Sequence, residues 1–115
     1  MYVYDRANLL AQDIKESPEF IEYNTLKDEL FQDETTKDLI KQFKKLQFEA
    51  QAAYMSGQAP SDEMMDKLQK LGQVLQLNEK VERFFMAEYK AQTILGDIYK
   101  LIGEASGLGT DFFGE

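Results

Sequence analysis

The spacing of apolar residues constrains the fold of this chain more than any other feature of the sequence. Through most of the 115 residues they recur at intervals of three and four, and only two prolines interrupt the pattern. These intervals match the 3.6-residue turn of an α-helix and not the strict alternation of a β-strand. Because 43% of the residues are hydrophobic and 30% are charged, such helices have both an apolar and a polar face. The sequence therefore predicts a globular all-α fold.

Capping and turn residues divide the pattern into five expected helices. Pro18 fits the first turn of a helix, where no N–H donor is needed, and Gly57 fits the left-handed position after a helix C-terminus. Serine, threonine, aspartate and asparagine favour the N-cap position because their side chains accept hydrogen bonds from the first turn. The expected starts are Asp5, Ser17, Asp33 or Thr35, Ser61 and Asn78, where Asn78 is either a cap or a kink within one long helix. The third helix is expected to reach Ser56, and the fifth to stop at Gly103 or Gly107.

The chain length fits one domain, and the helices of one domain cannot cover all of its apolar surface. A second core is not expected at this size, so we predict a single helical domain over residues 1–107 and a flexible tail over 108–115. The third and fifth helices are too long for two short N-terminal helices to cover. A leftover apolar stripe on a small chain is usually buried by another copy. We therefore expect a bundle of about five helices, with long C-terminal helices, that assembles as an intertwined homodimer; a tetramer stays open.

Two missing residue types limit the chemistry. The absence of cysteine removes thiolate nucleophiles and zinc–sulfur sites, and the absence of histidine removes the commonest general base. We predict a non-enzymatic protein without a metal or cofactor; an enzyme using carboxylates and a metal is the alternative. No run approaches the roughly 18 apolar residues of a membrane span, and the N-terminus lacks the pattern of a signal peptide. We therefore expect a cytoplasmic location and no membrane partner.

The charge is acidic overall and uneven along the chain. The net charge is −8; residues 1–33 hold eight acids against three bases, and residues 34–60 hold three acids against four bases. Those four bases, which we call the lysine face, share one side of the third helix: Lys37, Lys41, Lys44 and Lys45. An acidic partner or a phosphate can bind there, although such a run is more often a solvated surface. Without interleaved aromatic residues the face is a weak nucleic-acid footprint, so an RNA-binding accessory role is kept only as an alternative.

Polar residues on an otherwise apolar stripe are the other candidates for a specific contact. Glu88 lies on the stripe of the fifth helix, with Gln92 one turn further on. Such a residue can select a partner or fix a helix register, or it can reach water from the rim of the stripe. In the tail, Phe112 and Phe113 form either a short docking motif or a disordered end. The apolar candidates for an interaction surface are Phe43, Leu46, Phe84 and Phe85.

Several short blocks of the sequence resemble the YlbF/YmcA family of small helical proteins from Gram-positive bacteria, with its YheA-type members. The resemblance spans roughly residues 3–105 and rests on patterns of helix packing and capping, not on a catalytic signature. Its carriers are Tyr4–Ala11, Ser17–Phe20, Phe43–Gln47, Gly57, Leu77–Val81, Phe84, Ala87, Glu88, Gln92, Ile94, Leu95, Asp97 and Ile98.

The resemblance implies a helical, self-associating regulatory protein. Better-known members of the family form a complex with a third protein, YaaT, that is tied to competence, sporulation, biofilm formation and messenger-RNA processing by RNase Y. The expected partners are thus a second copy and YlbF-, YmcA- or YaaT-like proteins or RNase Y; a homo-oligomer of the YheA type is the alternative. Glu88 and Gln92 match family positions. The chain lacks the cysteine-rich tail of YlbF, so an iron–sulfur cluster has no obvious ligands here.

Overall fold

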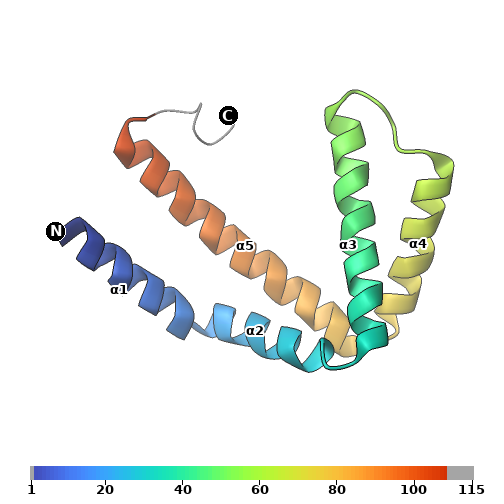
Figure 1. The fold of residues 1–115 in the computed structure, drawn as a ribbon, viewed down its shortest axis with the longest axis horizontal. Helices are drawn as coiled ribbons and strands as arrows, with labels where there is room; N and C mark the ends of the chain where they lie inside the picture. Colours follow the sequence, from blue (N-terminus) through green and yellow to red (C-terminus); the bar gives the residue numbers. More distant parts are fainter. Residues whose placement is uncertain (1, 109–115) are drawn as a thin grey trace. The chain divides into compact units, whose positions relative to one another are not determined.

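A computed structural model describes residues 2–108, which form five α-helices and no β-strand (Figure 1). The predicted all-α class with five helices is confirmed. The predictions for Phe112 and Phe113 lie outside the described residues. The helices are α1 (Tyr2–Glu16), α2 (Pro18–Leu30), α3 (Glu34–Met55), α4 (Asp62–Gln76) and α5 (Glu79–Ser106).

Three of the predicted N-caps are confirmed. Asp33 accepts hydrogen bonds from the backbone N–H of Thr36 at 3.4 Å and from its hydroxyl at 2.6 Å, and the hydroxyl bond holds the pKa of Asp33 below its ordinary value. Ser61 accepts from the N–H of Met64 at 3.1 Å, at the start of α4. Asn78 accepts from the N–H of Lys80 at 3.0 Å, which begins α5 as a new helix. Each side chain satisfies a donor that the first helical turn leaves without a partner.

The start of α1 and the partner of the Ser17 hydroxyl differ from the prediction, although Ser17 directly precedes α2 and its carbonyl oxygen accepts from the N–H of Ile21 at 3.0 Å. The first helix begins at Tyr2, three residues before the expected cap at Asp5. The Ser17 hydroxyl donates to the carbonyl oxygen of Ile14 at 2.9 Å, so its hydrogen bond closes the end of α1. Pro18 still takes the first position of α2, as predicted.

Glycines at two kinds of position give opposite expected effects on stability. Gly57 follows α3 with φ of +86°, whereas Gly96 lies inside α5 with open space where a Cβ would stand. A side chain at a left-handed position costs about 1–2 kcal/mol, and glycine inside a helix costs about 0.5–1 kcal/mol relative to alanine. We therefore expect Gly57→Ala to lower the free energy of unfolding and Gly96→Ala to raise it, by about 1 kcal/mol each. Urea unfolding followed by circular dichroism measures both; a stabilising Gly57→Ala would contradict the assigned turn.

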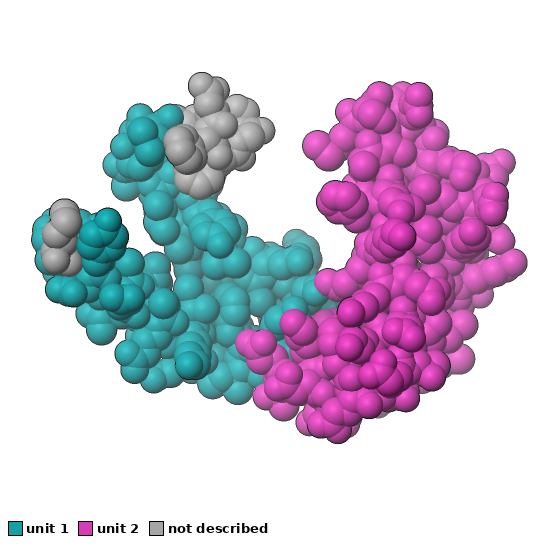
Figure 2. Space-filling view, in the orientation of Figure 1, with its two compact units in different colours: residues 1–23, 85–115 teal, residues 24–84 magenta. Residues whose placement is uncertain are grey.

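The described residues fall into two compact units, coloured separately in Figure 2. Unit 2 comprises residues 24–84 and contains the antiparallel pair of α3 and α4 (Figure 1). Its core includes three residues with almost no exposed surface: Ile40, Val81 and Phe84. An ion pair between Lys80 and Glu29, at 3.0 Å, joins α5 to α2 at its surface.

Unit 1 comprises residues 1–23 and 85–115, of which 2–23 and 85–108 are described. It contains α1 and most of α5. None of the residues of α1 is buried, and the fully buried residues of unit 1 among those described are two alanines of α5, Ala87 and Ala91. Unit 1 thus buries few large side chains of its own. The single domain over residues 1–107 stays a prediction.

Candidate interaction surfaces

The apolar stripes of α1 and α5 in unit 1 become more exposed toward the two ends of the chain. On α5, Ala91 is buried, Leu95 and Ile98 are half-buried, and Ile102 on the same stripe is 51% exposed. On α1, Ile14 is half-buried whereas Val3 is 56% exposed. Scattered apolar residues on a surface are normal, but apolar rows at helical spacing are typical of a surface that another chain covers. These two rows are the candidate interaction surface of unit 1.

Glu88 lies near a tyrosine of its own unit. It is half-buried on α5, and Tyr23, at the end of the unit 1 part of α2, is also half-buried. Burial, and then the negative charge of Glu88, raises the pKa of Tyr23 above its ordinary value of 10.0. Gln92, one turn further along α5, is exposed. The structure therefore gives Glu88 an electrostatic interaction inside unit 1, and its role in choosing a partner stays a prediction.

Removing the charge of Glu88 tests this arrangement. In Glu88→Gln we expect the pKa of Tyr23 to fall but to stay above 10.0, because burial is the larger cause of the shift. Carbon-13 NMR of the tyrosine ring carbons, titrated from pH 8 to 12, measures it, and Tyr23→Phe identifies the signal. An unchanged pKa in Glu88→Gln would show that the carboxylate does not act on Tyr23.

The same shift has a consequence for stability at high pH. A pKa that is raised in the folded protein means that folding favours the neutral phenol. The stability that Tyr23 contributes is therefore fully present below about pH 10 and is lost as the pH rises from there through the folded pKa. Tyr23→Phe is expected to lose less stability than the unmodified protein between pH 9.5 and 11.

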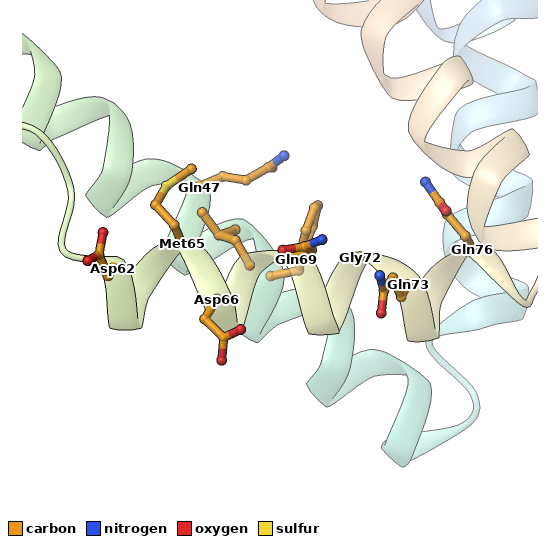
Figure 3. A pocket seen from close by; sticks show the side chains of 10 residues that line it. Gln47, Asp62, Met65, Asp66, Gln69, Gly72, Gln73 and Gln76 are labelled. Carbon is orange, nitrogen blue, oxygen red and sulfur yellow. The ribbon is translucent and has the colours of Figure 1, made fainter.

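A shallow groove of about 770 Å³ runs between α3 and α4 in unit 2 (Figure 3). Gly72 lies in its lining beside Phe43, whose ring is 3.5 Å from where a Cβ of residue 72 would stand, an ordinary van der Waals contact. Leu46, also on α3, is half-buried. Glutamine amides along the groove can donate and accept hydrogen bonds. Its lining includes Phe43, Met65 and Leu68 with Gln47, Gln69, Gln73 and Gln76.

The lysine face is only the first half of an exposed face of α3. Lys41 and Lys45 are exposed, and Lys37 and Lys44 are half-buried. The same side of the helix continues into two large apolar residues, which the prediction of the lysine face did not include. Phe48 is 72% exposed and Met55 is 89% exposed. Their spacing from Lys41, at seven and fourteen residues, is the signal in the sequence that shows they share its face.

Phe84 and Phe85 lie in different surroundings. The ring of Phe84 is 1% exposed and its centroid lies 6.2 Å from that of Phe31, in a tilted arrangement inside unit 2. Such aromatic pairs contribute to a core beyond the area they bury. Phe85 is half-buried. Of the two, only Phe85 has surface that another chain can contact in this structure.

Neither a metal cluster nor a membrane span is found in the described part of the chain. Within residues 2–108, no group of three or more acidic side chains is placed to hold a metal ion. None of the five helices is both long and apolar enough to cross a bilayer.

A family model decides which family this is. The model described as "Control of competence regulator ComK, YlbF/YmcA" matches residues 3–105. The chain belongs to this family. Among curated relatives, a UPF0342 protein of Caldicellulosiruptor saccharolyticus is 37% identical over 112 residues, which cover 97% of this chain and 93% of that protein. A UPF0342 protein of Halothermothrix orenii is 33% identical over 102 residues, covering 89% and 86%.

Two solved structures are similar to this fold. A protein of unknown function (DUF964) from Bacillus stearothermophilus has a TM-score of 0.70 at 20% identity, covering 91% of this chain and 92% of that one, and it supports the fold alone. The structure of Bacillus subtilis RicA in complex with RicF matches with a TM-score of 0.57 at 28% identity, covering 91% and 93%. The resemblance expected from the sequence is confirmed by the family model and the curated relatives.

The family blocks contribute both to the core and to the candidate surfaces. Asn78 caps α5, and Val81 and Phe84 are in the core of unit 2. These positions of the YlbF/YmcA pattern identify the fold. Other family positions lie on the candidate surfaces, namely the row of α5, the exposed face of α3 and the groove beside α4: Leu95, Ile98, Lys44, Lys45, Phe43 and Gln47.

Proposed function

We propose that this chain is a non-enzymatic adaptor that works by associating with a second copy of itself and with other proteins. The observation that carries the proposal is the exposure of apolar rows at the ends of α1 and α5, where Val3 and Ile102 are each more than half exposed. Burying such a row removes apolar area from water, at roughly 25 cal/mol per Å². A homodimer is the simplest assembly that covers both rows, because each copy brings the same surface.

The family supports a regulatory role for these contacts. The similar structure of RicA is that of a complex with RicF, so a protein of this fold assembles with another protein. We propose YlbF-, YmcA- or YaaT-like proteins, or RNase Y, as partners of this chain in the cytoplasm. Its role would then be to modulate messenger-RNA processing that depends on RNase Y, and through it competence, sporulation or biofilm formation.

Two measurements test the proposal. Sedimentation velocity over a hundredfold range of concentration shows whether the purified chain associates with itself; a monomer throughout that range would refute self-association. A tagged pull-down from the native organism, with mild crosslinking and mass spectrometry, identifies other partners. Nuclease treatment of the lysate removes proteins that are bridged by RNA. Recovery of none of the proposed partners at near-stoichiometric amounts would refute the adaptor role.

A further inference from the structure

Two helix faces, exposed except for the half-buried Lys44, match each other in chemistry. The α3 outer face comprises Lys41, Lys44, Phe48 and Met55, so it is basic in its first half and apolar in its second. The α1 outer face lies on a different side of α1 from the row that contains Val3, about 120° around the helix axis. It is apolar at its start and acidic at its end, and it comprises Tyr2, Leu9, Asp13 and Glu16, all exposed.

One antiparallel register pairs every member of one face with a suitable member of the other. With Leu9 opposite Phe48, the same register sets Glu16 opposite Lys41. It also pairs the remaining members, Tyr2 with Met55 and Asp13 with Lys44. The parallel orientation that keeps Leu9 opposite Phe48 places Glu16 beside Met55 and Tyr2 beside Lys41. Charge and apolar character therefore favour the antiparallel orientation.

We propose that α1 of one copy docks antiparallel on the α3 outer face of a second copy. The proposal rests on the self-association proposed above and names a contact within it. One chain supplies both halves, since residues 1–33 hold eight acids against three bases and residues 34–60 hold three against four. In a dimer with twofold symmetry the contact occurs twice.

In this contact the apolar residues supply binding energy, and the charged residues fix the orientation of the two helices. Phe48 is 72% exposed and Leu9 is 61% exposed, so burying them against each other supplies the driving force. Lys41 and Glu16, both exposed, fix orientation and register, as flanking charges do between paired helices. Glu16 accepts a hydrogen bond from Gln12 of the same helix at 3.2 Å. Lys44 already interacts within its own chain, so the test uses Lys41.

Exchanging the two charges tests the contact between copies. Lys41→Glu sets two acids opposite each other, and Glu16→Lys sets two bases opposite each other. We expect each variant alone to associate about tenfold more weakly than the unmodified protein, since two such pairs per dimer each lose an attraction and gain a repulsion. An equal mixture of the two variants restores opposite charges at both contacts of a mixed dimer. We therefore expect mixed dimers to form within about twofold of the original affinity.

Native mass spectrometry distinguishes mixed dimers from dimers of one variant, and sedimentation velocity gives the affinities. Lys67→Glu is the matched control, because it makes the same change of charge on an exposed face of α4. In a mixed dimer of Lys67→Glu with Glu16→Lys, only one of the two contacts has opposite charges. Circular dichroism confirms that each variant keeps its helices.

Each other result has a definite meaning. If the unmodified protein is a monomer, both this contact and the proposed self-association are wrong. If it associates but Lys41→Glu is neutral, or if the mixture does not recover, this contact alone is wrong. If Lys41→Glu leaves self-association intact and instead abolishes capture of another family protein, the face is used by that protein, which also overturns the proposal.

Discussion

Phe84→Ala is expected to lower the free energy of unfolding by about 3–5 kcal/mol. The side chain is 1% exposed, and its ring lies 6.2 Å from that of Phe31 between α5 and the end of α2. Truncation removes the buried ring, leaves a cavity, and takes away an aromatic pair in the core of unit 2. Urea unfolding at a fixed protein concentration, followed by circular dichroism at 222 nm, measures the loss.

Met86→Ala is the control for this prediction. Met86 lies two residues further along α5, and its side chain is exposed. Removing it also truncates a large apolar residue of the same helix, so we expect a change within about 0.5 kcal/mol. A loss below about 1 kcal/mol in Phe84→Ala, or equal losses in the two variants, would show that Phe84 is not a core residue.

The helices of this fold were predictable because their signals are local. A cap such as Ser61 and its acceptor bond to Met64 involve residues three apart, and the apolar rows follow the helical period. The predicted start of α1 was wrong because aspartate is a residue type that favours the N-cap position, whereas the residues before Asp5 are already helical. Ser17 does stand directly before α2, where its carbonyl oxygen accepts from the N–H of Ile21 at 3.0 Å, but its hydroxyl bonds to the end of α1. A serine hydroxyl can serve the end of one helix or the start of the next, so its partner was not predictable from the sequence.

The candidate sites were less predictable because they depend on which helices meet. Glu88 was recognised as a polar residue on an apolar stripe, but nothing in its spacing points to Tyr23, sixty-five residues earlier. Phe84 was expected as a candidate contact, and its burial beside Phe31 follows from tertiary packing. Phe48 and Met55 were accessible from the sequence, since both continue the face of Lys41. Only the structure shows that they are left exposed.

Self-association is expected to weaken at least about 100-fold in the double variant Val3→Glu/Ile102→Glu. Covering each apolar side chain is worth about 1.5–3 kcal/mol, a dimer buries two copies of each, and about 2.7 kcal/mol corresponds to 100-fold in affinity. Both residues are more than half exposed in unit 1, so a charge there does not disturb the fold of one chain. The control Val74→Glu/Leu77→Glu adds the same charges at exposed apolar positions of unit 2 and should associate normally. Sedimentation velocity measures both; equal weakening would show that net charge, and not the rows of α1 and α5, controls association.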